Sequence, residues 1–163
     1  MAVFILIYNK QLDTSMIQIE HLAPNQTDYI EQLVPLVQQF LSSSATLERI
    51  QQAVASSSTF VLIALDTTTS PTWTVVGTAT LATTACLTGL RSHIEDVVVD
   101  AAWRRQGIAG QLIQAAILYA QNSLDVRTID LTSRPDRVAA NTLYKKLGFV
   151  ERDTNIYRYL PPQ

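Results

Sequence analysis

The stretch VVVDAAWRRQGIAGQ, residues 97–111, is the most informative part of the sequence for predicting the fold. Its three consecutive valines predict a buried β-strand, because β-branched side chains favour the pleated backbone of a sheet. Two arginines and a glycine follow, and from residue 107 to residue 122 apolar residues recur at the spacing of one helix face. A buried strand therefore meets a helix through an Arg-Arg-Gln-Gly turn.

A junction of this kind is typical of an anion site. The first backbone N–H groups of a helix have no partner within it, and the helix dipole places positive charge there. Glycine lets the backbone approach a phosphate closely, and the forked guanidinium of arginine suits phosphate oxygens. We expect this junction to bind a pyrophosphate. The alternative is that two surface arginines simply precede a helix.

The sequence lacks two other phosphate-binding patterns. It contains no GxxxxGK[ST], which excludes a P-loop. It also lacks GxGxxG, and hairpins rather than helices connect the strands before the junction, which disfavours a dinucleotide-binding fold.

Length and composition narrow the class of protein. A chain of 163 residues with 47% hydrophobic and 16% charged residues predicts one folded domain. The net charge of −2 offers no basic field for a phosphate backbone, so we expect no nucleic-acid partner. A single cysteine, Cys86, excludes an internal disulfide. No spacing of Cys and His predicts a metal site.

The first fifteen residues are not predicted to belong to the folded domain. The segment AVFILIY, residues 2–8, is too short to span a bilayer and lacks the pattern of a signal peptide. We therefore expect a cytoplasmic protein with no membrane partner. Because MIQIEHL, from Met16, forms a better first strand, the domain is expected over residues 16–163. Residues 1–15 are then an extension, an extra strand, or a partner-binding arm that would allow a homodimer.

Hydrophobic periodicity gives the order of the elements. We expect strands at 16–22, 60–65, 73–83, 93–99, 126–131 and from 149 onward, and helices at 27–41, 46–55, 107–122 and 136–147. The middle strands form an antiparallel meander joined by short turns. The order predicts an α+β fold with a central mixed, mostly antiparallel sheet and helices on both of its faces.

Two motifs resemble those of the GNAT superfamily of N-acetyltransferases. The pattern [QR]-x-x-G-x-[GA] of the family's motif A is met by Arg104, Gly107 and Ala109. Downstream, NTLYKKLGF, residues 141–149, resembles the helix-to-strand motif in which a tyrosine precedes a Gly-Phe pair. With the strand order, the resemblance extends from residue 16 to the C-terminus and implies a single-domain GNAT-like fold.

The resemblance implies that acetyl-CoA binds as a co-substrate, without a metal. It implies a pyrophosphate site on the turn and the helix start, pantetheine pairing with the valine strand, and a further contact from the last helix. The implied residues are Val97, Val98, Val99, Arg104, Arg105, Gln106, Gly107, Ile108, Ala109, Gly110 and Asn141. Many family members carry asparagine seven residues before the tyrosine, where this chain has Arg137, so the role of Asn141 departs from the usual pattern.

Acetyl transfer to an amine requires removal of a proton from the amine and donation of a proton to the thiolate. Glu95 and Asp96 precede the valines, and neighbours on a strand face opposite ways. By analogy with the family we choose Glu95 as the base, with a water relay as the alternative. The resemblance also implies Tyr144 as the general acid, because a phenol is protonated at neutral pH. Cys86 is interpreted as a small buried residue rather than a nucleophile.

The acceptor is the least determined part of the prediction. We expect a primary amine of a small molecule, amino acid or peptide, acetylated directly in a ternary complex. The stretch IEDVVVD resembles the corresponding strand of glucosamine-6-phosphate acetyltransferases, so an amino-sugar phosphate is an alternative. Arg49 is the only Lys or Arg between residues 26 and 58, which poorly suits a phosphate. A domain that only binds acetyl-CoA, as a sensor or scaffold, is the alternative from another class.

Overall fold

A computed structural model describes residues 16–69 and 71–161 of the chain. The predicted extension or extra strand at residues 1–15 lies outside the described residues. The chain divides into two compact units, one ending at Thr132 and the other beginning at Ser133, and each is described by itself. None of the helices among the described residues combines the length and apolarity needed to cross a bilayer.

The described part of the first unit is built on a five-stranded sheet with the order β1-β2-β3-β4-β5. The strands are β1 (Ile17–His21), β2 (Thr59–Asp66), β3 (Thr74–Cys86), β4 (Gly89–Val99) and β5 (Val126–Leu131). Neighbours from β1 to β4 are antiparallel, whereas β5 runs parallel to β4. The predicted mixed, mostly antiparallel sheet is therefore confirmed. β4 begins four residues before the predicted start at residue 93, because it continues into a tight hairpin with β3.

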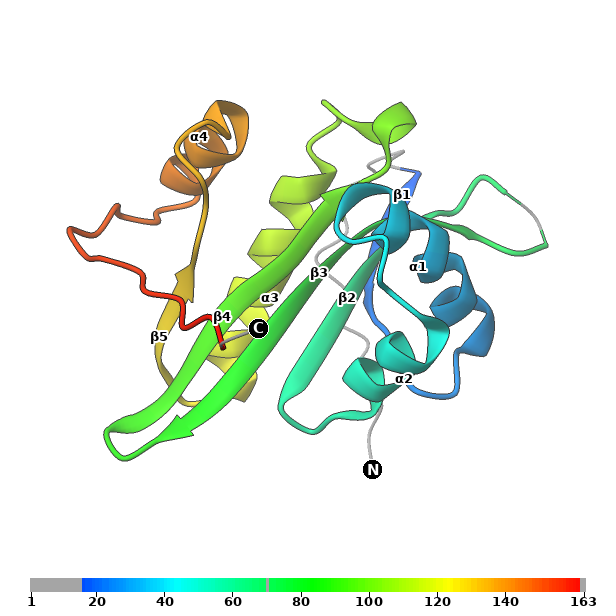
Figure 1. The fold of residues 1–163 in the computed structure, drawn as a ribbon. Helices are drawn as coiled ribbons and strands as arrows, with labels where there is room; N and C mark the ends of the chain where they lie inside the picture. The colour runs from blue at the N-terminus through cyan, green and yellow to red at the C-terminus, as the bar shows by residue number, and fades with distance from the viewer. Residues whose placement is uncertain (1–15, 70, 162–163) are drawn as a thin grey trace. The chain divides into compact units, whose positions relative to one another are not determined.

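Helices cover both faces of this sheet, as predicted. Figure 1 shows α1 (Thr27–Phe40) and α2 (Leu47–Ala55) in front of the sheet and α3 (Ile108–Ser123) behind it. The side chain of Thr46 caps α2 by accepting a hydrogen bond from the Arg49 N–H at 3.3 Å. Pro35, a predicted kink or break, lies within a continuous α1.

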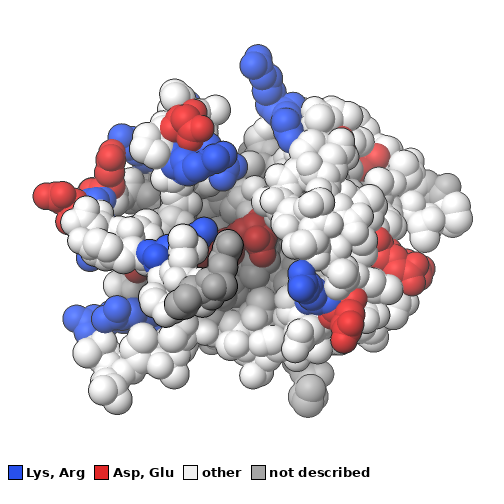
Figure 2. Space-filling view, viewed as in Figure 1, with Lys and Arg blue, Asp and Glu red and all other residues white. Residues whose placement is uncertain are grey.

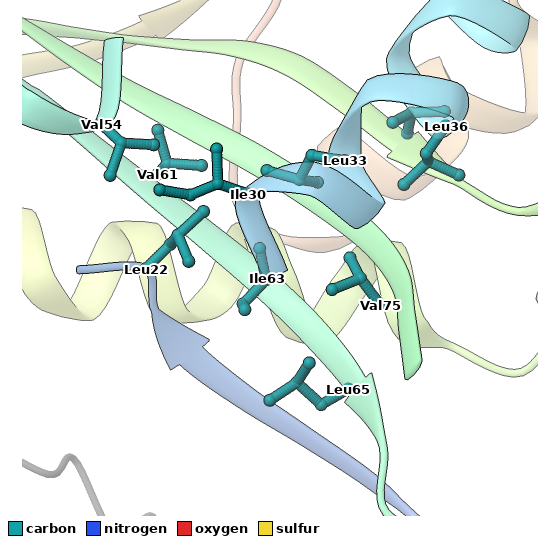
Figure 3. Packing of buried hydrophobic residues seen from close by; sticks show 10 residues of the cluster. Leu22, Ile30, Leu33, Leu36, Val54, Val61, Ile63, Leu65 and Val75 are labelled. Carbon is teal, nitrogen blue, oxygen red and sulfur yellow. The ribbon is translucent and has the colours of Figure 1, made fainter. Parts of the chain in front are cut away.

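The core on the front face joins α1 to the middle of the sheet. Ile30 and Leu33 point from α1 onto Ile63 of β2, and all three are at most 2% exposed (Figure 3). Burying each such side chain contributes about 1.5–3 kcal/mol. On the other face α3 buries an apolar stripe that includes the predicted Ile108, Leu112 and Ala116.

Among the described residues of the second unit, 133–161, the one regular element is α4 (Val138–Lys146), within the predicted range 136–147. The predicted strand from residue 149 to the C-terminal IYRYL is wrong for the described structure, because residues 149–161 form neither strand nor helix. Ile156, Tyr157 and Tyr159 are 74–87% exposed. Alternation of apolar residues predicts a strand only when another strand supplies backbone partners, and residues 133–161 contain none.

Candidate active site

A β-bulge interrupts β4 just before the valines. Thr78 of β3 pairs with Val98, and Thr80 pairs with Glu95. Between these pairs, the two residues at 96–97 of β4 oppose a single residue of β3. An extra residue of this kind leaves backbone groups outside the ladder and changes the direction of nearby side chains.

Glu95 and Asp96 are adjacent in the sequence, but the bulge gives them different backbone positions. Glu95 pairs with Thr80, whereas Asp96 belongs to the bulge. Asp96 adopts the left-handed conformation with φ of 53°, which Asp tolerates better than most residues. Although much of Asp96 is exposed, partial burial of its carboxyl group raises the pKa of Asp96. No glycine occurs at this bulge, so the sequence carries no local signal that predicts the bulge.

Glu95 lies on the face of the sheet that α1 and α2 cover. Residues paired across antiparallel strands share a face. Thr78 pairs with the core residue Ile63, which lies beneath α1, and Thr80 is two residues further along the same strand. Its partner Glu95 is therefore on that face as well, and it is exposed there.

Beyond the bulge, no strand of the first unit's described residues pairs with the second edge of β4, and this stretch, residues 95–99, is termed the open edge. The register of β4 with β5 ends at the pair Ile94–Leu131, so residues 95–99 extend past the end of β5. Figure 1 shows β4 continuing past the end of the shorter β5. The Asp100 N–H donates to the Val76 carbonyl at 2.9 Å and so faces β3. Because successive peptide groups alternate in direction, the N–H and C=O of Val99 face the open edge.

The first N–H groups of α3 lie outside the hydrogen-bond ladder of the helix. The first hydrogen bond of the helix runs from the Gln111 N–H to the Gly107 carbonyl at 3.1 Å. The N–H groups of Ile108, Ala109 and Gly110 precede it and have no acceptor within the helix. Gly107 has φ of 79°, and a Cβ placed on it would meet nothing within 4 Å. The helix start is thus open to an approaching anion.

The two arginines of the turn differ in their contacts. The Nε of Arg104 donates to the Val99 carbonyl at 3.1 Å, and its guanidinium carbon lies 4.7 Å from the centre of the Phe40 ring. Arg105 is exposed, and its backbone has φ of 64°. The sequence predicted a phosphate role for both arginines and did not identify Phe40 as a partner.

The first unit brings nearly all the predicted donor-binding residues to this strand and turn. Val98, Val99 and Ile108 are buried, whereas Val97, Ala109 and Gly110 are half-buried and Arg104, Arg105, Gln106 and Gly107 are exposed. A buried valine side chain and a free backbone edge are compatible, because they point in perpendicular directions.

The second unit holds Tyr144 and Asn141 on α4. Tyr144 is 8% exposed, and its ring meets that of Phe149 edge-on with 6.2 Å between ring centres. The Asn141 side-chain amide donates to the Arg134 carbonyl at 3.0 Å and so fixes the loop before α4. Arg137, at the position usual for asparagine in the family, is the exposed residue that precedes the helix.

A family model for the acetyltransferase (GNAT) family matches residues 26–149, which include the bulge, the turn and α4. The chain belongs to the GNAT acetyltransferase family. It is therefore an acyltransferase of a family that uses acetyl-CoA. Both motifs on which the sequence resemblance depends lie within the matched residues.

Comparison with known proteins agrees with this assignment. The chain is 39% identical over 61 residues to the L-amino acid N-acetyltransferase AaaT of Escherichia coli strain K12. The match covers 36% of this chain and spans only 38% of that relative. No groups of three or more His, Cys, Asp or Glu able to hold a metal ion occur in the part of the chain that the structure describes.

Two solved structures share the fold of this GNAT acetyltransferase. An aminoglycoside acetyltransferase from an uncultured soil metagenomic sample, in complex with sisomicin, has a TM-score of 0.76 at 19% identity, with 91% of this chain and 97% of that chain covered. AAC(6')-Iy, in complex with a bisubstrate analogue of CoA and acetylneamine, has a TM-score of 0.73 at 18% identity, with 91% and 100% covered.

Proposed function

We propose that this GNAT acetyltransferase transfers the acetyl group of acetyl-CoA directly to a primary amine of a small molecule, amino acid or peptide in a ternary complex. One observation carries the proposal. The open edge of β4 at residues 95–99 leads, through one short turn, into the open N-terminus of α3. A ligand that combines amides with a pyrophosphate matches both features.

The donor side fits this ligand in two places. Pantetheine carries two amides, which can pair as an added strand would with the edge of β4 that β5 leaves unpaired at residues 97–99, where the Val99 carbonyl already accepts from Arg104. The pyrophosphate would then meet the N–H groups of Ile108, Ala109 and Gly110, together with Arg105 and Gln106. The open space at Gly107 supports this fit, because any side chain there would stand in the path of the phosphate.

Glu95 is proposed to remove a proton from the amine, directly or through a water relay. An alkyl ammonium with a pKa of about 10.4 must lose a proton before it can attack a thioester. Glu95 lies on the face that α1 and α2 cover, beside the bulge where backbone N–H groups are free of the ladder. Such an N–H near Val97 would stabilise the oxyanion.

Tyr144 is proposed to protonate the departing thiolate. A phenol hydroxyl can donate its proton as the carbon–sulfur bond breaks. Burial of the ring against Phe149 limits the rotation of the side chain, which favours a fixed position for the hydroxyl. Asn141 is proposed as a secondary donor contact, since its amide oxygen remains available when the amide N–H groups bind the Arg134 carbonyl.

Three observations support a small amine without a phosphate group over a sugar phosphate as the acceptor. Arg49 is the only Lys or Arg between residues 26 and 58. Its guanidinium donates to the Ser44 carbonyl at 2.8 Å and so stabilises the loop between α1 and α2. The surface over these helices is largely uncharged in Figure 2. The partial match to an L-amino acid N-acetyltransferase makes amino acids the first acceptors to test.

An amine panel read by free thiol tests this proposal. The panel contains L-amino acids, short peptides, aliphatic amines, an aminoglycoside and glucosamine 6-phosphate. We expect acetyl-CoA-dependent thiol release above the no-amine background with at least one primary amine, and much less with glucosamine 6-phosphate. Binding of acetyl-CoA by calorimetry without thiol release from any amine would instead favour a sensor and would reject the proposed activity.

A further inference from the structure

Arg104 makes two contacts that no phosphate ligand requires. Its Nε donates to the Val99 carbonyl, and its guanidinium lies over the Phe40 ring at 4.7 Å. That distance is within the roughly 6 Å range of cation–π attraction. One side chain thereby connects the open edge of β4 to the last residue of α1.

The face of the sheet that carries the proposed base Glu95, beneath α1 and α2, is taken as the acceptor side, and Arg104 joins this side to the donor edge of β4. Val99 faces the open edge proposed for the donor, and Phe40 packs against the core cluster that contains Val98. The loop that follows Phe40 is held at its far side, where the Gln38 side chain donates to the Ala45 carbonyl at 2.8 Å. The Arg104 contact fixes the near side of the same loop.

We propose that Arg104 is a positioning residue that ties the α1 C-terminus to β4 and so shapes the acceptor side, while the pyrophosphate is bound by Arg105 and the N–H groups of α3. This assignment rests on the proposed function, because it assumes that an amine acceptor binds to the protein. Arg105 suits the phosphate role, because no hydrogen bond, ion pair or ring contact engages its side chain within residues 16–69 and 71–161.

The variant Arg104→Lys distinguishes a positioning role of Arg104 from a phosphate-binding role. Lysine keeps the charge and can still bind a phosphate, but it cannot donate to Val99 and cover Phe40 with a planar group at once. Phe40→Leu removes the ring without touching any cation of the turn, and Phe40→Tyr restores an aromatic face. Arg105→Gln is the matched control on the adjacent residue.

Three measurements are compared: CoA affinity by calorimetry, hydrogen exchange over residues 34–46, and KM for the best amine. We expect Arg104→Lys and Phe40→Leu to speed exchange and to raise the amine KM about threefold to tenfold, with CoA affinity within about twofold of wild type. Phe40→Tyr should behave as wild type. Arg105→Gln should weaken CoA about tenfold without changing exchange over residues 34–46.

Two results would overturn the assignment. One is that Arg104→Lys weakens CoA as much as Arg105→Gln while exchange over residues 34–46 stays at the wild-type rate. The other is an amine KM that neither Arg104→Lys nor Phe40→Leu changes. If the wild-type chain acetylates no amine, the proposed function fails, and exchange together with CoA affinity still decides whether Arg104 positions α1 or binds phosphate.

Discussion

Gly77 of β3 lies so close to Val98 of β4 that a Cβ added to the glycine would be 3.0 Å from the Val98 carbonyl oxygen. The same atom would be 3.3 Å from Cδ1 of Leu112 on α3. A backbone carbonyl within a ladder cannot move as easily as the end of a side chain. The absence of a side chain at residue 77 therefore allows β4 and α3 to take the positions that form the candidate site.

Gly77→Ala is expected to lower the free energy of unfolding by about 1–3 kcal/mol, the usual cost of overpacking a core. Urea denaturation followed by circular dichroism measures this change. Because β4 must shift to accept the methyl group, CoA affinity should fall as well. An unfolding midpoint equal to that of the wild type would show that the two strands separate without cost.

Gly107→Ala tests the phosphate site at the start of α3. Alanine in the left-handed region costs about 1–2 kcal/mol, and its methyl group would enter the open space beside the first N–H groups. We expect CoA affinity to fall at least tenfold in calorimetry. Gly89→Ala is the control: it imposes strain at φ of 117° in the hairpin between β3 and β4, at the opposite end of β4. Equal loss of CoA affinity in both variants would contradict the assignment.

The sequence predicted one part of the candidate site and missed two others. The Arg-Arg-Gln-Gly turn was identifiable because glycine at a helix start and β-branched residues before it are local signals. The bulge was not, because Asp96 takes a conformation for which the sequence carries no glycine. The residues of the Arg104–Phe40 contact are 64 positions apart in the sequence. Hydrophobic periodicity predicts local elements and cannot predict a contact between residues so far apart.

The missing terminal strand has a related cause. Apolar alternation at Ile156 to Leu160 is a property of the segment alone, whereas a strand also needs a backbone partner. Within the second unit α4 offers none, and these side chains remain exposed. Local pattern therefore predicted α4 within two residues at each end and failed for the segment whose structure depends on non-local pairing.

Tyr144→Phe tests the proposed general acid. The substitution removes only the hydroxyl group and keeps the ring that meets Phe149, so the unfolding midpoint and CoA affinity should stay close to wild type. Loss of general acid catalysis should lower kcat about a hundredfold or more. Steady-state thiol release measures kcat. A kcat within about twofold of wild type would assign the proton donation to water or to another residue.

Asp96→Asn gives a pH-dependent effect on stability. Burial raises the pKa of Asp96 in the folded chain, so the folded state holds this proton more tightly than the unfolded state does. The stabilising effect of the proton is present below the unfolded pKa of about 3.9 and is lost as pH rises through the folded pKa. At pH 7 the charged carboxylate therefore costs stability, and asparagine removes that cost.

We expect Asp96→Asn to raise the urea midpoint at pH 7, with a gain that shrinks as the pH is lowered towards 3. Asparagine also tolerates the left-handed conformation of this residue. Asp96→Ala is the matched control, because it removes the same charge but strains the backbone at φ of 53°, and it should be less stable than Asp96→Asn at every pH. A gain for Asp96→Asn that grows towards low pH would mean that the folded chain favours the charged carboxylate.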